Sequence, residues 1–313
     1  MPKHFLSILN LSHAELEHCL DVASAMKRDR HMRRRAPSAD ALDGRHVALL
    51  FEKPSLRTRS TFEVAVHELG GHVLSPPSDV ALGGREDLRD VARNLERWVA
   101  AAVIRTFSQQ RLVTVAECAP SLSVINALSD EEHPCQALAD FLTLKEHWGR
   151  LDGETLAFVG DGNNVAASLA HAGSMLGVNV HVASPEGYEL PSRVVEEAAA
   201  VSRHGAKVRL FRDPREAVRD ARAVYTDVWA SMGQEAEADE RADLFRPYQV
   251  NADLMAAAAR DAAFLHCLPA HRGDEVTDEV IDASYSLVFT EAENRLHTQK
   301  ALLFMLLGEG ATC

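Results

Sequence analysis

The chain has 313 residues, which is long for one hydrophobic core and sufficient for two domains of about 150 residues each. Apolar residues make up 46% of the chain and charged residues 25%, proportions typical of a water-soluble globular protein. The formal net charge of -13 argues against general binding to nucleic acid or acidic membranes, but it leaves room for a local basic pocket that holds a small anion.

The cysteines and the N-terminus indicate the compartment. Five cysteines are widely spaced and form no C-x-x-C pair, which predicts a reducing environment without a disulfide framework. The N-terminus lacks the long apolar core of a signal peptide, and no apolar run approaches the roughly 20 residues that span a bilayer. We therefore expect a cytoplasmic protein. The spacing of the fifteen histidines suggests no metal set, and we expect no metal and no cofactor.

The first half of the chain is predicted to alternate helices and strands. Ser12 precedes an amphipathic pattern that predicts a capped helix over 12–29. The apolar run over 46–51 predicts a buried strand, and the spacing of apolar residues over 57–69 predicts a helix. The other predicted elements are a short strand from 73, a loop over 75–87, a helix over 88–99, a strand over 101–104 that ends on Arg105, and a strand over 123–127.

The turn between the first strand and its helix is a candidate anion site. A strand that turns sharply into a helix directs backbone N–H groups and the positive end of the helix dipole at one spot. Ser55 and Thr58 add hydroxyl donors there, and Arg57 and Arg59 add forked, permanently charged donors. The alternative is an ordinary capped helix with solvated arginines, because short motifs carry a false-positive risk.

A long helix over 133–147 separates the two halves, and we predict a domain hinge near it. The second half alternates strands and helices, which predicts a parallel sheet with helices on both faces. The predicted strands are 155–160, 178–183, 207–211, 223–227, 263–267 and 286–290. The predicted helices are 163–176, 193–204, 214–220, 251–258, 276–283 and 291–308. The expected fold is α/β, with two doubly wound domains joined by long helices: residues 1–132, with 291–313 packing back on them, and residues 133–290.

Polar side chains recur after nearly every predicted strand. Ligands of open parallel sheets bind at the carboxyl ends of the strands, so these positions are candidate site residues. Gly160-Asp161-Gly162 also suggests a dinucleotide-binding turn, but a third glycine is missing and no isolated acidic residue closes the next strand. Asn163 and Asn164 are therefore better interpreted as amide contacts for a small polar ligand.

Four motifs follow one another along the chain: Ser55-Leu56-Arg57-Thr58-Arg59, His133-Pro134-Cys135-Gln136, Asp227 with Ser231-Met232-Gly233, and His266-Cys267-Leu268-Pro269. In order and spacing they resemble those of the aspartate/ornithine carbamoyltransferases, and the resemblance covers essentially the whole chain. The Ser-Met-Gly and His-Cys-Leu-Pro elements are similar to those of the ornithine branch. The resemblance implies transfer of a carbamoyl group from carbamoyl phosphate to the δ-amine of ornithine, giving citrulline and phosphate, a step of arginine biosynthesis.

The resemblance also implies roles for individual residues. Those expected to bind carbamoyl phosphate are Ser55, Leu56 through its N–H, Arg57, Thr58, Arg105, His133, Gln136, Cys267, Leu268 and Arg295. Those expected to take part in catalysis are Arg105, His133, Gln136, Cys267 and Arg295. Those expected to bind ornithine are Asn164, Asp227, Ser231 and Met232. In this reading the amine attacks directly, without a metal or a covalent intermediate, so Cys267 need not be a nucleophile.

Two positions depart from the family pattern. Leu56 stands where many relatives have threonine, which removes a hydroxyl and leaves the backbone donor. Ala81 stands where the family tends to have a glutamine or histidine that reaches the phosphate of the neighbouring subunit, and Arg85 could replace that contact. The family assembles as trimers, so the resemblance implies a homotrimer or a multiple of trimers.

Three other readings stay open at this point. The acceptor could be another amine, such as putrescine, lysine or N-acylornithine; aspartate fits less well, because the Ser-Met-Gly element offers a dicarboxylate no cationic pocket. The chain could be a non-catalytic homologue, although the presence of Arg57, Arg105, His133, Gln136 and Arg295 disfavours this. An NAD-dependent dehydrogenase is disfavoured by the incomplete glycine pattern.

Overall fold

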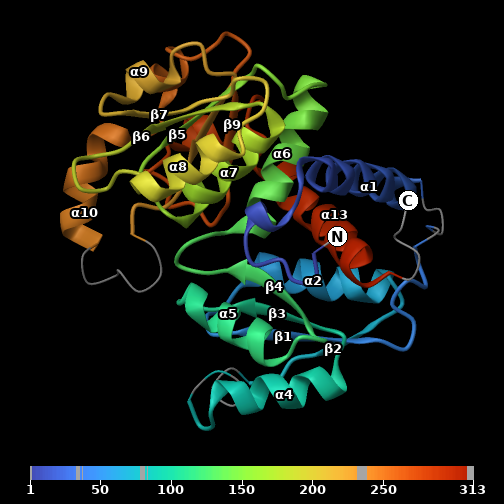
Figure 1. The fold of residues 1–313 in the computed structure, drawn as a ribbon. Coiled ribbons are helices and arrows are strands. Elements are labelled where there is room, and N and C mark those ends of the chain that lie inside the picture. Colours follow the sequence, from blue (N-terminus) through green and yellow to red (C-terminus); the bar gives the residue numbers. More distant parts are fainter. Residues whose placement is uncertain are drawn as a thin grey trace. The chain divides into compact units, whose positions relative to one another are not determined.

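The computed structural model describes residues 2–32, 36, 38–77, 82, 84–230 and 238–308, and it divides into two compact α/β units (Figure 1). Unit 1 comprises Met1–Leu142 and Glu293–Cys313, and unit 2 comprises Thr143–Ala292. Within the described residues, no helix combines the length and apolarity that crossing a membrane requires. The two units are described one at a time below.

Unit 1 is built on a four-stranded parallel sheet with the order β2-β1-β3-β4. The central strand β1 is buried from its second residue onward, as expected for a strand covered on both faces. Its register with β3 places Phe51 beside Arg105, so both strands end at the same edge of the sheet. The strands are β1 (His46–Phe51), β2 (His72–Leu74), β3 (Ala101–Arg105) and β4 (Ser123–Leu128).

Two helices of unit 1, α1 and α4, begin at residues whose side chains cap them. Ser12 and Glu15 form a capping box at the start of α1, and Asp87 accepts a backbone N–H at the start of α4. Leu95 of α4 and Leu112 of α5 pack with Leu50 and Ile104 in one hydrophobic cluster against the sheet. The helices are η1 (Ile8–Asn10), α1 (His13–His31), α2 (Leu56–Glu68), α4 (Leu88–Trp98), α5 (Gln109–Cys118), α6 (Pro134–Trp148) as far as Leu142, and α13 (Val288–Leu307) from Glu293 onward.

Unit 2 is built on a five-stranded parallel sheet with the order β7-β6-β5-β8-β9. Its strands are β5 (Thr155–Val159), β6 (Asn179–Ala183), β7 (Val208–Phe211), β8 (Ala223–Thr226) and β9 (Ala263–His266). Its helices are α7 (Asn164–Leu176), α8 (Ser192–Ala200), α9 (Pro214–Val218), α10 (Ala238–Phe245), η3 (Arg246–Tyr248), α11 (Ala252–Met255) and α12 (Asp278–Ile281).

Each sheet has a point where the strand order reverses, and this point locates the expected ligand crevice. In unit 1 the chain proceeds from β1 outward to β2 and then returns to β3, so the reversal lies between β1 and β3. In unit 2 it lies between β5 and β8. Ligands of open α/β sheets bind outside the carboxyl ends of the strands at such a reversal. The loops after these four strands are therefore the first places to search for a site.

The predicted fold class, two doubly wound parallel sheets with flanking helices, is confirmed, and one predicted strand is wrong. Residues 286–290 form no strand, because only Ser286 makes an isolated bridge, to Phe264, and α13 already begins at Val288. Helices α5 and α10 were not predicted. The division between the units falls inside α6 and after Ala292, whereas the predicted domain limits were 132/133 and 290/291.

Candidate functional site

The first part of the candidate site is the N-terminus of α2 in unit 1. Ser55 occupies the N-cap position, but its side chain makes no capping hydrogen bond, and Leu56 is the first helical residue. The Leu56 side chain is 76% exposed, so it contributes nothing to the core and leaves its N–H as the functional group at this position. The opening N–H groups of a helix have no partner within the helix and carry its positive dipole end, which suits an anion.

Three arginines from separate elements converge on one histidine. Arg57 comes from α2, Arg105 from the end of β3 and Arg295 from α13, and the charge of each acts on His133, which directly precedes α6. Arg105, His133 and Arg295 are buried, and Arg295 donates a hydrogen bond to the Thr58 hydroxyl. Such a concentration of positive charge, two of its three arginines buried, suits a bound dianion, because charge-assisted hydrogen bonds to arginine are strong and weakly screened where water is excluded.

The same surroundings set the protonation state of His133. Burial is the main cause that holds its pKa well below the ordinary value, and the positive charges of Arg295, Arg105 and Arg57 lower it further. His133 is therefore a neutral imidazole at neutral pH. A neutral imidazole has one N–H donor and one acceptor, so it can donate to a carbonyl oxygen without carrying charge.

This arrangement predicts a dependence of stability on pH. A histidine whose pKa is lower in the folded state than in the unfolded state destabilises the fold as the pH falls below the unfolded value, because the unfolded chain then binds more protons. We expect the contribution of His133 to the free energy of unfolding to fall below about pH 6.5, by up to about 1.4 kcal/mol per pH unit. Urea unfolding of the wild type and of His133→Gln between pH 5 and 8 measures this, and equal slopes for the two proteins would refute it.

Two polar contacts fix neighbouring parts of this site. Gln136 donates from Nε2 to Asp140 Oδ1 over 2.8 Å, and both side chains are buried on α6. Glu52, the residue after β1, accepts hydrogen bonds from the Thr106 hydroxyl and from the guanidinium of Arg111. Because Glu52 and Thr106 follow β1 and β3, this carboxylate joins the two loops at the strand reversal of unit 1. Only one local signal pointed to this role, an acidic residue at the carboxyl end of a buried strand.

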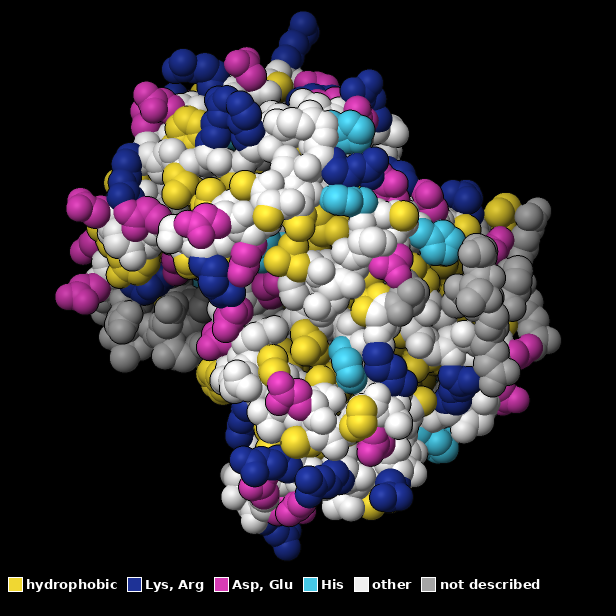
Figure 2. Space-filling view, in the orientation of Figure 1, with side chains coloured by type: hydrophobic (Ala, Val, Ile, Leu, Met, Phe, Trp, Pro, Cys, Tyr) yellow, Lys and Arg dark blue, Asp and Glu magenta, His cyan; other side chains and the backbone are white. Residues whose placement is uncertain are grey.

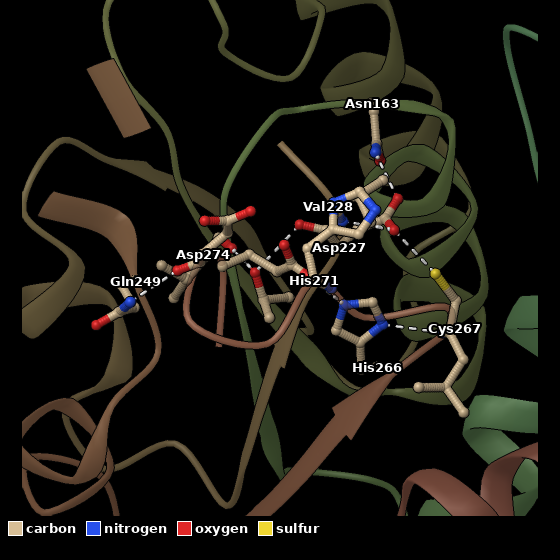
Figure 3. Close-up of polar contacts among 12 residues, drawn as sticks. Asn163, Asp227, Val228, Gln249, His266, Cys267, His271 and Asp274 are labelled. Carbon is tan, nitrogen blue, oxygen red and sulfur yellow. Dashed lines mark hydrogen bonds and ion pairs between the residues drawn. The ribbon is translucent and has the colours of Figure 1, made fainter. Parts of the chain in front are cut away.

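Asp227 is the centre of the second part of the candidate site, in unit 2 (Figure 3). It follows β8, and its Oδ2 accepts from Asn163 Nδ2 over 2.8 Å. Its Oδ1 accepts from the Val228 N–H over 2.8 Å and from the Cys267 thiol over 3.0 Å. The carboxylate is therefore held by the loops after β5, β8 and β9. Asn163 also caps α7 by accepting from the backbone of Val165 and Ala166, which orients its amide toward Asp227.

A partly buried ion pair lies beside this carboxylate. Arg241 of α10 donates to Asp161 Oδ2, and its guanidinium lies 4.6 Å from the ring centroid of Tyr188. Burial raises the pKa of Asp161; Arg241 opposes this rise, and the negative charge of Asp227 adds to it. Arg241 offsets the charge of Asp161, so Asp227 supplies the net negative charge at the strand reversal of unit 2. Sequence reasoning missed Arg241, because nothing local relates it to Asp161.

The loop that carries Cys267 is fixed by buried hydrogen bonds of His266. His266 Nδ1 accepts from the Leu268 N–H over 2.9 Å, so the ring proton is on Nε2, which lies 3.1 Å from Glu275 Oε1. The same oxygen accepts from the His271 N–H over 2.6 Å. The side chains of His266 and Glu275 are fully buried. Glu275 was not singled out from the sequence, where it is one acidic residue among many.

Removal of the Glu275 carboxylate is expected to destabilise unit 2. Glu275→Ala deletes one buried and one partly buried hydrogen bond and leaves the His266 N–H without its acceptor, so we expect the free energy of unfolding to fall by about 2–4 kcal/mol. Urea unfolding monitored by circular dichroism measures the loss. Glu279→Ala, at an exposed position nearby, is the matched control and should change stability by less than about 0.5 kcal/mol. Equal stability of both variants would contradict this role.

The structure groups most predicted site residues into two sets, one in each unit. Ser55, Leu56, Arg57, Thr58, Arg105, His133, Gln136 and Arg295 belong to unit 1, and Asn164, Asp227, Cys267 and Leu268 belong to unit 2. Asn164 is the first residue of α7, beside the capping Asn163. Ser231, Met232 and Ala81 lie outside the described residues. Arg85 is described, and it is exposed.

One face of the described surface mixes charged side chains of both signs (Figure 2). On the face drawn in Figure 2, lysine and arginine side chains are interspersed with aspartate and glutamate side chains. A nucleic-acid interface would instead gather lysine and arginine into one patch or stripe. The positive charge that carries the functional argument below is the arginine group around His133.

Comparison with known proteins matches two family domains along the chain. The carbamoyl phosphate-binding domain of aspartate/ornithine carbamoyltransferases matches residues 3–146. The aspartate/ornithine-binding domain of the same enzymes matches residues 152–306. The first range contains Arg57, Arg105 and His133, and the second contains Asp161, Asp227 and Arg295.

Individual relatives match over nearly the full chain. The ornithine carbamoyltransferase of Acidothermus cellulolyticus is 51% identical over 310 residues, which cover 98% of this chain and 97% of the relative. The crystal structure of the Thermus thermophilus enzyme of the same name superposes with a TM-score of 0.88 at 43% identity, covering 98% of this chain and 99% of that one. The structure of the Pyrococcus furiosus enzyme superposes with a TM-score of 0.93 at 46% identity, covering 98% and 97%. The chain therefore belongs to the aspartate/ornithine carbamoyltransferase family.

Proposed function

We propose that this protein transfers the carbamoyl group of carbamoyl phosphate to the δ-amine of L-ornithine, giving L-citrulline and phosphate. The observation that carries the proposal is the opposite charge of the two candidate sites. Three arginines place positive charge near His133 in unit 1, and Asp227 supplies negative charge beside the Asp161–Arg241 ion pair in unit 2. The first suits a phosphate dianion, and the second suits the α-ammonium group of an amino acid. Family membership supports the same pairing of substrates.

Carbamoyl phosphate is held by unit 1 in this proposal. The phosphate binds at the N-terminus of α2, through the Ser55 hydroxyl, the Leu56 N–H, and the side chains of Arg57 and Thr58. Arg295 donates to Thr58 and so extends the charged cradle from α13. Gln136 holds the carbamoyl amide. Arg105 and His133 donate to the carbamoyl carbonyl oxygen.

The same donors account for catalysis. The carbonyl oxygen gains negative charge as the amine attacks and a tetrahedral intermediate forms. Donors fixed in a buried site stabilise this developing charge more than they stabilise the substrate. Arg105 is held at the end of β3 and His133 at the start of α6, so neither needs to reorganise during the reaction. The phosphate leaves as a dianion that the three arginines already neutralise.

Ornithine is held by unit 2 in this proposal. Asp227 pairs with the α-ammonium group, and its three hydrogen bonds keep the carboxylate oriented. Asn164, Ser231 and Met232 serve the rest of the amino-acid backbone. Cys267 and Leu268 line the site near the reacting amine. The Cys267 thiol donates to Asp227, which gives it an orienting role and requires no covalent intermediate.

The δ-amine must lose a proton before it attacks. A free alkylamine has a pKa near 10.4, so most ornithine arrives protonated. Desolvation and the nearby arginine charges favour the neutral amine. The departing phosphate accepts a proton as the carbamoyl bond to oxygen breaks. The substrates and the residues named above thus supply the donors and acceptors of every step, and we propose direct transfer without a cofactor.

We further propose that the protein is cytoplasmic, acts in arginine biosynthesis, and assembles as a homotrimer or a multiple of trimers. The family resemblance of the whole chain supports the trimer. The absence of a disulfide pattern among the cysteines supports a reducing compartment. Sedimentation equilibrium measures the assembly directly, and a monomer at micromolar concentration would refute the trimer.

A second acceptor is the main alternative, and one assay separates the possibilities. Carbamoyl phosphate is offered with ornithine, putrescine, lysine and aspartate in turn, and the ureido product and phosphate are quantified. We expect turnover with ornithine, because Asp227 offers a carboxylate for an α-ammonium group. Putrescine lacks an α-carboxylate, so preferential turnover of putrescine would assign another acceptor. Absence of product with all four amines would refute carbamoyl transfer to these acceptors.

A further inference from the structure

A second cluster of chemically active side chains lies in unit 1, on α1 and α13. His31 is the last residue of α1, and Glu293 and His297 lie on α13. His31 Nε2 lies 2.7 Å from Glu293 Oε1, and His297 Nε2 lies 3.5 Å from the same oxygen. One nitrogen or oxygen atom of each residue lies within 4.8 Å of the corresponding atoms of the other two. The proposed reaction uses none of these three side chains.

The spacing of the ligand atoms is close to that of a transition-metal site. Zinc binds histidine nitrogens at about 2.0–2.1 Å and carboxylate oxygens at about 2.0–2.2 Å, usually in a tetrahedron. Two ligands of such a tetrahedron are about 3.4 Å apart. The distance from His297 to Glu293 already has this value, and the distance from His31 to Glu293 needs to open by less than an ångström. Glu293 and His297 are four residues apart on one helix, which places them on the same face.

Burial and charge single out the oxygen that faces both histidines. The side chain of His297 is fully buried, and neither of its ring nitrogens makes a regular hydrogen bond within the described residues. Lys27 lies 3.9 Å from the other oxygen of Glu293, Oε2, and donates to the side chain of Asn294. Oε1 is therefore the oxygen that is available to a shared cation. His31 is 55% exposed, so a cation can enter from solvent.

We propose that His31, Glu293 and His297 form a binding site for a divalent transition metal such as Zn²⁺. Two imidazoles and one carboxylate are a ligand set that zinc uses, with a water molecule in the fourth position. Binding uses the lone pair of His31 Nε2, so the ring carries its proton on Nδ1 in the metal-bound form. The bound metal ties the C-terminal end of α1 to α13. Hard cations such as Mg²⁺, which prefer all-oxygen ligands, should not compete.

The site lies on a different face of α13 from the proposed phosphate contact. Arg295 is two residues from both Glu293 and His297, and successive residues of a helix turn by about 100°. Its side chain therefore points roughly away from the metal ligands. We accordingly expect the metal to stabilise the packing of α1 on α13 without being required for carbamoyl transfer.

The test must separate this site from a second group of potential ligands. Asp227, His266 and Cys267 also place their ligand atoms within 4.8 Å of one another, in the candidate substrate site of unit 2. All metal measurements are therefore made in full-length Cys267→Ser protein. Zn²⁺ is titrated by isothermal calorimetry, and the melting temperature is followed with added Zn²⁺ or Mg²⁺. Co²⁺ serves as a visible probe, because its absorption reports on tetrahedral coordination.

His31→Gln is the main variant, because this side chain is largely exposed and its replacement should not disturb folding. We expect one Zn²⁺ to bind per chain and to raise the melting temperature, and His31→Gln and Glu293→Gln each to abolish the rise. Loss of a direct ligand should weaken Zn²⁺ binding by more than the roughly 10–100-fold that loss of a supporting residue costs. His18→Gln, at an exposed position on α1, is the matched control and should bind Zn²⁺ as tightly as its parent.

The outcomes are decisive in both directions. Tetrahedral Co²⁺ absorption that His31→Gln and Glu293→Gln remove, and that His18→Gln retains, would support the site. Unchanged Zn²⁺ affinity in His31→Gln and Glu293→Gln, or equal stabilisation by Mg²⁺, would overturn it. Turnover of carbamoyl phosphate in the His31→Gln protein without the Cys267→Ser change is measured separately, so failure of the metal site and failure of the proposed transfer reaction are distinguishable.

Discussion

Arg105→Met is expected to lower kcat by about 10²–10³-fold, because it removes a fixed donor from the carbonyl oxygen that becomes charged as the amine attacks. Arg105 is buried at the end of β3, and methionine preserves much of its length, so the fold should persist. Steady-state kinetics with saturating ornithine measure the effect, and circular dichroism checks the fold.

Two further variants make this result specific. Arg105→Lys retains a positive charge but loses the forked donor geometry, so it should recover only part of the lost rate. Arg93→Met changes an exposed arginine of α4 that pairs with Asp90, and it should leave kcat unchanged. A normal kcat in folded Arg105→Met would remove Arg105 from the catalytic residues.

Asp227→Asn is expected to raise the KM for ornithine strongly while leaving the KM for carbamoyl phosphate near its wild-type value. The substitution keeps the shape of the side chain and removes the negative charge that pairs with the α-ammonium group. Loss of one partner of a buried charge pair costs about 2–5 kcal/mol, which corresponds to about 30- to 5,000-fold in affinity. Initial rates measured against each substrate in turn separate the two constants.

The control for this prediction is another aspartate of unit 2. Asp243→Asn changes an exposed side chain of α10 that pairs with Arg246, so both KM values should remain at wild-type levels. If Asp227→Asn instead raised the two KM values equally, Asp227 would have a structural role in the site and would not bind ornithine directly.

Much of the fold follows from patterns that are local in the sequence. The strand predicted over 46–51 has the same bounds as β1, because a parallel strand buried on both faces has a continuous apolar sequence. Residues 286–290 are also a short apolar run, but the last three of them are the first residues of α13, which begins at Val288. A short apolar run does not distinguish a strand from a buried helix start, and only the pairing partner decides.

The candidate site shows the same division between local and distant information. The turn at Ser55 and the strand end at Arg105 could be predicted from the sequence, because helix starts and strand ends have local sequence signals. The pairing of Asp161 with Arg241 could not, since the two residues are far apart in the chain and meet only in the fold. For the same reason the spacing of Glu293 and His297 became suggestive only when the end of α1 supplied His31.

The exposed side chain of Leu56 has a consequence for how this site is mapped by mutagenesis. If position 56 acts through its main-chain N–H, alanine scanning passes over it, because every residue with a free amide supplies the same donor. Proline is the exception. It is favoured at the first position of a helix, so the helix tolerates it, yet it has no N–H to donate. Of the nineteen possible substitutions at this position, only proline therefore tests the contribution of the backbone N–H to phosphate binding.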